Sequence, residues 1–344
     1  MNTQTINTVS LENYLAGKLP GFEGSLVAEK YPGGQSNPTF LLSSGTQRWV
    51  LRRKPPGDIL SSAHAVDREF QVLGALASSD VPVAQVHLFC DDKDVIGSMF
   101  YLMEHLGGRV FWDPQLPEVS SRQERAAIYD EMNRVLAAIH AVETDLIGLD
   151  GYGKPGNYIE RQIGRWIRQY RASETTRCDA MEQLIRWLPE HLPSMEERIS
   201  LVHGDFKIDN LMFHKTEARV IGVLDWELST LGDPIADLAY LVMTWQLGKD
   251  DQLRGLDGVD RVALGLPTDE AFISRYCDRA GIDSIAHWEF YLAFCFFRSA
   301  AILQGVHKRT LVGTASSNDS TSWRSAVERF ASLGLLALEK QSLP

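Results

Sequence analysis

Cysteine is scarce in this chain, and its few copies are widely spaced. The four cysteines, Cys90, Cys178, Cys277 and Cys295, form no Cys-x-x-Cys pair. Neither a disulfide framework nor a zinc site is therefore indicated. We expect them to behave as small, buried apolar residues.

Long hydrophobic runs are missing as well. The longest, Phe290–Phe297, is far too short to cross a bilayer. The first residues, Met1–Glu12, are polar and lack the basic start and apolar centre of a signal peptide. We therefore expect a cytoplasmic protein without a membrane segment.

Basic residues are outnumbered, since 34 Lys and Arg face 45 Asp and Glu and leave a net charge of -11. This argues against nucleic acid as a partner, because phosphate backbones require clustered basic side chains. An acidic surface suits a cationic substrate, but many soluble enzymes are equally acidic, so the charge identifies no substrate. With 44% hydrophobic and 23% charged residues, the composition is that of an ordinary globular protein.

The first 105 residues have the pattern of a small sheet with one helix. Runs rich in aromatic and branched residues at Thr39–Ser43 and Gln47–Arg52 flank Ser44-Gly45-Thr46, which predicts a hairpin. The other elements predicted here are strands at Val83–Cys90 and Ser98–Glu104, the polar turn Asp91–Asp94 between them, and a helix at Ala65–Ala77.

Beyond this part amphipathic helices predominate, interrupted by one hairpin at Leu211–Phe213 and Val220–Leu224. We therefore expect an α+β protein with two lobes. Residues 1–105 would form a small N-terminal lobe built on an antiparallel sheet, and residues 106–344 a larger, mainly helical lobe. The predicted helices are Arg122–Val142, Tyr158–Ser173, Thr176–Leu188, Ala236–Gln246, Asp269–Ala280 and His287–His307.

The most informative segment is His203–Asn210, which is followed after the hairpin by Leu224–Glu227. An Asp and an Asn spaced like Asp205 and Asn210 recur in kinase catalytic loops, where the Asp accepts the hydroxyl proton and the Asn holds a metal ion. The short hairpin returns Asp225 to the neighbourhood of Asn210, and such oxygens beside phosphates suit Mg²⁺. Each carboxylate alone could be an ordinary loop residue or helix cap, but the joint pattern favours phosphoryl transfer.

Four further stretches carry a family resemblance: Gly33–Asn37, Val50–Gly57, Arg68–Phe70 and Gly232–Ala239. With the catalytic segment, they resemble the aminoglycoside phosphotransferase and choline kinase group of small-molecule kinases, which share the protein-kinase-like fold. Within that group they look most like the kinase-like domain fused to some acyl-CoA dehydrogenases. The resemblance implies phosphorylation of a hydroxyl group with ATP or GTP, and a functional link to an acyl-CoA dehydrogenase.

The resemblance also assigns the nucleotide contacts of the N-terminal lobe. Gly34 and Ser36 stand in its phosphate-covering turn. Arg52 stands where the family has a strand Lys that pairs the α- and β-phosphates, and Glu69 where it has the helix partner of that Lys. Met103 to His105 would be the hinge whose backbone binds the purine edge.

Arginine in place of lysine is a departure from the family, because a planar fork and a point charge are not interchangeable. Arg52, Arg53 and Lys54 are therefore all candidates for the phosphate contact. Alternation along the strand favours Arg52, which lies on the face opposite Trp49 and Leu51.

Three residues around the catalytic segment have alternative interpretations. Lys207 is placed to touch the moving phosphoryl group, although a solvated loop lysine would look the same. Asp233 and Asp237 could be metal ligands. We expect instead that Asp233 caps the helix beginning near Pro234 and that Asp237 hydrogen-bonds the backbone of the catalytic loop.

The acceptor is expected among the helices of the second lobe, where Arg161 and Trp166 form one candidate face and Trp288 and Arg298 another. Arginines beside an aromatic wall suit an acceptor with a carboxylate or phosphate, whereas an aminoglycoside pocket needs clustered acids. The resemblance to the dehydrogenase-linked domain implies an acceptor of this kind, a hydroxy acid or its CoA thioester. Aminoglycosides, choline and homoserine are the alternative acceptors. The aromatic residues can equally be core, and the arginines can pair at the surface.

Two other classes of function compete with a kinase. One is a catalytically silent module that binds nucleotide, which the joint presence of Asp205, Asn210 and Asp225 argues against. The other is a phosphatase or nuclease in which Asp205, Asp209 and Asp225 hold two metal ions. It would require further ligands, such as His203 or His214.

Overall fold

The computed structural model describes residues 5–31, 37–55, 65–154, 156–193, 198–249, 251, 253–312 and 320–339. The chain forms two compact units. Unit 1 extends to Val110 and includes Ile147–Leu149 and Leu211–Ser229, and unit 2 holds the rest. The predicted hairpin after the catalytic segment therefore belongs to unit 1, and the functional division after residue 105 stays a prediction.

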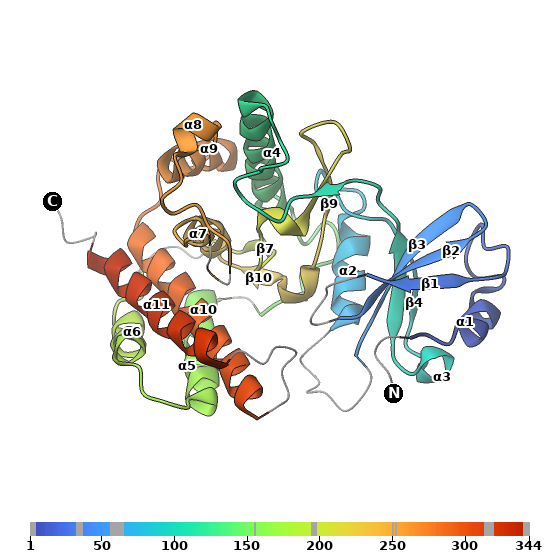
Figure 1. The fold of residues 1–344 in the computed structure, drawn as a ribbon, viewed down its shortest axis with the longest axis horizontal. Helices are drawn as coiled ribbons and strands as arrows, with labels where there is room; N and C mark the ends of the chain where they lie inside the picture. Colours follow the sequence, from blue (N-terminus) through green and yellow to red (C-terminus); the bar gives the residue numbers. More distant parts are fainter. Residues whose placement is uncertain are drawn as a thin grey trace. The chain divides into compact units, whose positions relative to one another are not determined.

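Unit 1 is built on a five-stranded antiparallel sheet with the strand order β1-β2-β3-β5-β4 (Figure 1). The predicted hairpin is confirmed, since Thr39 pairs with Arg52 and Ser44 with Gln47. The strands are β1 (Val27–Lys30), β2 (Thr39–Ser44), β3 (Gln47–Arg53), β4 (Val86–Cys90) and β5 (Phe100–Glu104).

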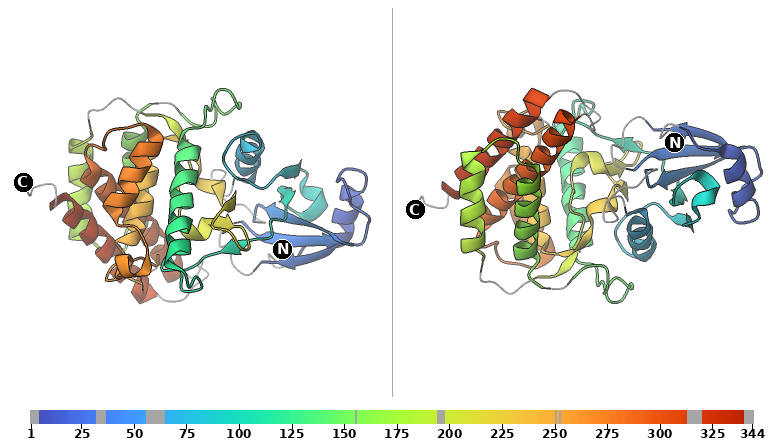
Figure 2. Two further views of the ribbon diagram at one scale, coloured as in Figure 1. Left: turned by 90° about the horizontal axis from the view of Figure 1, so that it is seen from above. Right: turned by 90° about the horizontal axis from the view of Figure 1, so that it is seen from below.

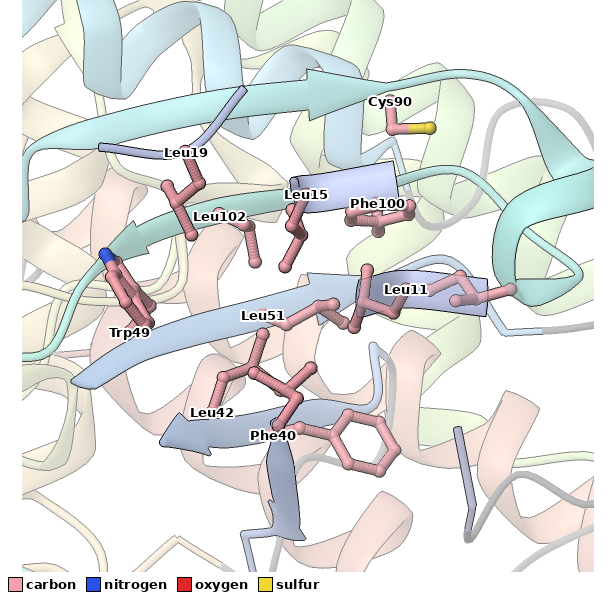
Figure 3. Close-up of a cluster of buried hydrophobic side chains, with 12 residues drawn as sticks. Leu11, Leu15, Leu19, Phe40, Leu42, Trp49, Leu51, Cys90, Phe100 and Leu102 are labelled. Atoms are coloured by element: carbon pink, nitrogen blue, oxygen red, sulfur yellow. The ribbon is translucent and has the colours of Figure 1, made fainter. Parts of the chain in front are cut away.

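One face of this sheet packs against α1 (Thr8–Leu15), which the sequence pattern did not predict. Leu11 and Leu15 are fully buried in a cluster with Leu51 of β3 and Leu102 of β5 (Figure 3). Their spacing of four residues places them on one side of the helix. Cys90 lies in the same cluster, as expected for a small apolar residue.

The predicted helix is confirmed as α2 (Val66–Leu76), which packs against β4 and β5. The prediction of a polar turn at Asp91–Asp94 was incomplete, because the short helix α3 (Lys93–Ile96) begins there. The Asp92 side chain caps this helix by accepting a hydrogen bond from the Asp94 amide at 2.9 Å. Unit 1 also contains a small sheet of β6 (Arg109–Val110), β8 (Leu211–Phe213) and β9 (Val220–Val223), followed by the short helix η2 (Trp226–Leu228).

Unit 2 is mainly helical, with a two-stranded antiparallel sheet of β7 (Ser200–Val202) and β10 (Thr230–Gly232). Two predicted helices match to the residue, and the unpredicted α11 adds a long C-terminal helix. The elements are α4 (Arg122–His140), α5 (Tyr158–Ser173), α6 (Asp179–Glu190), η1 (Ile208–Asn210), α7 (Pro234–Trp245), α8 (Arg261–Leu264), α9 (Asp269–Ala280), α10 (Trp288–Leu311) and α11 (Ser320–Glu339).

Helix α10 forms the centre of unit 2, where it packs against α5, α6, α7 and α11 (Figure 2). Nearly every side chain from Phe290 to Ala301 is buried. By length and composition α10 could cross a membrane, but 78% of its apolar window is buried inside the protein. That burial is typical of a core helix.

Candidate active site

The catalytic loop leaves β7 of unit 2 through a backbone path that only glycine adopts easily. Gly204 has φ +83°, in the left-handed region that favours glycine. The amides of His203 and Gly204 donate hydrogen bonds to the carboxylate of Asp237, at 2.7 and 2.8 Å. Asp237 is 3% exposed, so the predicted role of this residue as a backbone anchor is confirmed.

Asp237 keeps its charge because its buried carboxylate is well supplied with donors. His140 Nε2 lies 3.4 Å from Asp237 Oδ2, and Tyr276 Oη lies 2.7 Å from the other ring nitrogen. Burial alone would raise the pKa of Asp237, but the hydrogen bonds from His140 and the His203 amide outweigh it and lower that pKa. The predicted cap is also confirmed, since Asp233 accepts from the Ile235 amide at 2.9 Å.

Asp205, the predicted base, is held by two side chains of unit 2. Its Oδ1 accepts a hydrogen bond from Tyr240 Oη at 2.5 Å, and its Oδ2 accepts one from Asn210 Nδ2 at 2.9 Å. Burial and the nearby Asp205 charge raise the pKa of Tyr240 well above its usual range, so this phenol remains a donor. The Asp205 side chain is 23% exposed and can still accept a proton.

Tyr240 is a functional residue that the sequence analysis missed. It lies on α7, three residues after Asp237, and residues at that spacing share one face of a helix. The anchoring role predicted for Asp237 could therefore have directed attention to Tyr240.

Asn210 has the chemistry of a metal ligand. Its amide nitrogen donates to the Asp205 backbone oxygen at 2.8 Å as well as to the Asp205 carboxylate. Because both bonds use Nδ2, the remaining polar atom is Oδ1, a neutral oxygen of the kind that Mg²⁺ accepts.

Lys207 pairs more closely with Asp209 than with Asp205. Its Nζ lies 2.5 Å from Asp209 Oδ2 and 3.8 Å from Asp205 Oδ2. The Lys207 side chain is 19% exposed, so it is neither fully solvated nor buried. Its predicted contact with the phosphoryl group stays a prediction.

In unit 1, Arg52 of β3 and Glu69 of α2 come together as the resemblance implied. Arg52 Nε lies 2.7 Å from Glu69 Oε2, to which Tyr101 Oη donates at 3.2 Å. Burial raises the pKa of Glu69 to about 7, against the opposing attraction of Arg52. Burial lowers the pKa of Arg52, but its carboxylate neighbours outweigh that effect, and the pKa is raised.

Arg52 also contacts the two acids that follow β9. Its guanidinium donates to Asp225 Oδ1, and Glu227 Oε2 lies 3.8 Å from it. Oxygens of Glu69, Asp225 and Glu227 all lie within 4.8 Å of one another, which is close enough to share a cation. Asp225 has the left-handed φ of 63°, which is uncommon outside glycine and recurs at functional sites. Its carboxylate is 34% exposed and fits the oxygen chemistry of Mg²⁺.

The other residues to which the resemblance assigns nucleotide contacts are placed as follows. The Arg53 guanidinium stacks over Phe40 at 5.3 Å, on the face opposite Arg52. Met103 lies in the ladder opposite Val50, and His105 directly follows β5. Gly34 and Ser36 lie outside the described residues. Asn37, just beyond them, donates to Glu227 at 3.3 Å, a contact that the sequence did not indicate.

The candidate acceptor residues do not form one cluster. Arg298 is buried, donates to the Gly204 carbonyl at 2.6 Å, and lies over Trp166 and Tyr240. Trp288 is about 15 Å from Arg298 along α10, by the rise of a helix. Arg161 donates to the Lys154 carbonyl at 2.7 Å. Arg298 therefore supports the catalytic loop, and substrate contacts by these four residues stay predictions.

The chain matches a family described as the phosphotransferase enzyme family over residues 27–277. It is 49% identical over 317 residues to mouse acyl-CoA dehydrogenase family member 10. The matched region covers 92% of this chain and 30% of the mouse protein. The chain therefore spans less than a third of that relative.

Solved structures are similar as well. A protein of Ralstonia eutropha JMP134 assigned as an aminoglycoside phosphotransferase has a TM-score of 0.88 at 47% identity, covering 98% of this chain and 99% of the other. A streptomycin–ATP–APH(2″)-IIa ternary complex has a TM-score of 0.59 at 16% identity, covering 95% and 97%. The predicted α+β, protein-kinase-like fold is thereby confirmed.

Proposed function

The chain belongs to the phosphotransferase enzyme family, as its motifs predicted, and from that premise we propose that it transfers the γ-phosphate of ATP or GTP to a hydroxyl group of a small molecule. The observation that carries this proposal is the Asp205 carboxylate, fixed by Tyr240 and Asn210 on a loop that Asp237 anchors.

In the proposed reaction Asp205 orients the acceptor hydroxyl and accepts its proton. The acceptor oxygen forms a bond to the γ-phosphorus while the bond from that phosphorus to the bridging oxygen of ADP breaks. Lys207 stabilises charge on the moving phosphoryl group, for which its ammonium is suited.

Asn210 in unit 2 and Asp225 in unit 1 are the residues that would each offer an oxygen to Mg²⁺, which neutralises phosphate charge when bound. Arg52 is the proposed phosphate contact of unit 1. Glu69 and Asp225 already orient its guanidinium, whereas Arg53 faces away. Gly34, Ser36, Met103 and His105 remain proposed nucleotide contacts on the resemblance alone.

A hydroxy acid or its CoA thioester is the acceptor that we favour over aminoglycosides, choline and homoserine. The relative from mouse is an acyl-CoA dehydrogenase family member of which this chain matches one part. A kinase joined to such an enzyme would act on the same acyl compounds, so we also propose a functional link to an acyl-CoA dehydrogenase.

A two-metal phosphatase is less well supported by the loop geometry. His203 is fully buried, and its Nδ1 accepts the Asp205 amide at 3.2 Å, so this ring is already used in the loop. Asp209 is paired with Lys207. Neither side chain is arranged as an additional metal ligand.

The test is a thermal unfolding experiment with and without MgATP. We expect MgATP to raise the melting temperature, because binding to the folded state stabilises it by mass action. Asp225→Ala should abolish the rise, whereas Glu217→Ala, an exposed carboxylate of the neighbouring hairpin, should preserve it. Phosphate ester hydrolysis without any nucleotide, and no response to MgATP or MgGTP, would support the phosphatase instead.

A further inference from the structure

A cavity of about 330 Å³ lies beside the catalytic loop within unit 2. Lys207 and Asp209 line it from the loop, Trp112 from the segment before α4, Trp245 from the end of α7, and Arg254 from the loop that follows α7. The four candidate acceptor residues chosen from the sequence are absent from this lining. A molecule bound in this cavity beside Lys207 would therefore contact other residues than the four predicted from the sequence.

The charge of this cavity has the opposite sign to that of the whole chain. Lys207 and Asp209 neutralise one another at 2.5 Å. Arg254 is exposed, and within the described part of the chain it makes no hydrogen bond or ion pair. The neighbouring Asp251 is engaged by Arg329 at 3.0 Å. Counted over the described lining residues, one positive charge thus remains at the cavity, in a protein whose net charge is -11.

The position of Arg254 is set by a tight backbone turn. The Gly255 amide donates to the Gly248 carbonyl at 3.2 Å, and the Leu256 amide donates to the Trp245 carbonyl at 3.0 Å. A Cβ atom at Gly255 would lie 2.0 Å from the Leu247 oxygen, so only glycine permits this approach. Arg254 is therefore held next to the end of α7 by the fold itself.

Part of the cavity lining is apolar. Trp112 is 64% exposed although it is one of the largest hydrophobic side chains, and Leu253 beside Arg254 is half-buried. An aliphatic chain that covers an exposed tryptophan removes apolar surface from water, which makes binding more favourable. Among the described residues that line this cavity, Asp209 is the only carboxylate, which does not suit a polycationic aminoglycoside.

We propose that this cavity binds the acceptor of the phosphoryl transfer, with an aliphatic chain against Trp112 and an anionic group on Arg254. This inference rests on the proposed function and names its substrate class. At roughly 30 Å³ per small group, the cavity holds on the order of ten non-hydrogen atoms. A medium-chain hydroxy acid fits within it, whereas only the acyl part of a CoA thioester would.

The test uses hydroxyoctanoates with the hydroxyl at each chain position, their CoA thioesters, and octanediols that lack the carboxylate. We expect Arg254→Gln to raise KM for the preferred anionic acceptor about tenfold, which is about 1.4 kcal/mol. The values of kcat and of KM for ATP should stay within about twofold of those of the unmodified protein. The contact of Arg254 with the acceptor stabilises the ground state and the transition state equally, so its loss does not change kcat. The KM of the diol should not change.

Trp112→Ala should raise KM for the acid and the diol together, because both present the same chain. Arg161→Gln is the matched control, since Arg161 belongs to the acceptor face predicted from the sequence. An Arg254→Gln effect on the free acids assigns a carboxylate to Arg254, and an effect on the thioesters alone assigns a CoA phosphate.

Two results would overturn the proposal. One is a KM effect of Arg161→Gln without one of Arg254→Gln. The other is the absence of phosphorylation of every hydroxyoctanoate and thioester by an enzyme that MgATP still stabilises. The second result would leave the proposed nucleotide site intact. A failure of the proposed acceptor cavity can therefore be distinguished from a failure of the proposed function.

Discussion

Asp205 shows which single-residue contacts a sequence can and cannot specify. Asn210 was predictable because it lies in the same loop, at a spacing that kinase chemistry requires. Tyr240 was not predicted, because it comes from α7 and reaches Asp205 only after that helix folds against the loop. Its one signal in the sequence is its spacing of three residues from Asp237, which places both side chains on one face of the helix.

The hydrogen bond of Tyr240 leads to a prediction for Tyr240→Phe. Removing the hydroxyl frees one carboxylate oxygen of the base, so we expect kcat to fall about tenfold, as loss of a hydrogen bond to a charged group implies. The KM for ATP should stay nearly constant, because Tyr240 contacts the base alone among the proposed catalytic residues. Steady-state kinetics with both substrates varied will measure the change in kcat and the change in KM for ATP separately.

Tyr291→Phe is the control for that experiment. Its hydroxyl also donates to a buried aspartate, Asp233, at 2.7 Å, but serves the helix cap rather than the base. Both variants should lose similar stability, and an equal loss of kcat in both would show that Tyr240 has only a structural role.

Arg52 illustrates a choice that the structure narrowed. Alternation along β3 favoured Arg52 among Arg52, Arg53 and Lys54, and the guanidinium groups of Arg52 and Arg53 do lie on opposite faces of the sheet. Glu227 and Asn37 could not be predicted in their roles, because their hydrogen bond joins residues 190 positions apart.

Helices were predictable where apolar residues recur with helical spacing over several turns. Helices α5 and α9 match their predicted bounds, and Thr268 caps α9 through the Ala271 amide at 3.2 Å. The helices α1, α3 and α8 were missed because they are short and carry few apolar positions. Long α11 was missed because it follows a polar stretch that resembles a terminal loop.

The first turn of α7 is the element on which the catalytic loop depends. We expect Asp237→Ala to lower the free energy of unfolding by roughly 3 kcal/mol, because it leaves the buried amides of His203 and Gly204 without acceptors. Urea denaturation will measure the change. Asp278→Ala, an exposed carboxylate on α9, should alter stability by less than about 0.5 kcal/mol. Equal stability of Asp237→Ala and the unmodified protein would contradict the anchoring role.

At the scale of the whole molecule, the sequence predicted a sheet-based part followed by a helical part, and both are present. By composition the apolar window of α10 resembles a membrane span, but 78% of it is buried inside the protein, as in a core helix. The proposed acceptor cavity could not be predicted from the sequence. Trp112, Lys207 and Arg254 are far apart in sequence, and only tertiary folding lines one cavity with them.

The central claim is that this fold transfers phosphate with Asp205 as base. The most direct measurement is transfer of isotopically labelled γ-phosphate from ATP to hydroxy acids and hydroxyacyl-CoA thioesters, by the unmodified protein and by Asp205→Asn. We expect labelled phosphate esters from the unmodified protein only, with a rise in melting temperature on MgATP binding that is nearly equal in both. Full transfer by Asp205→Asn would contradict the account.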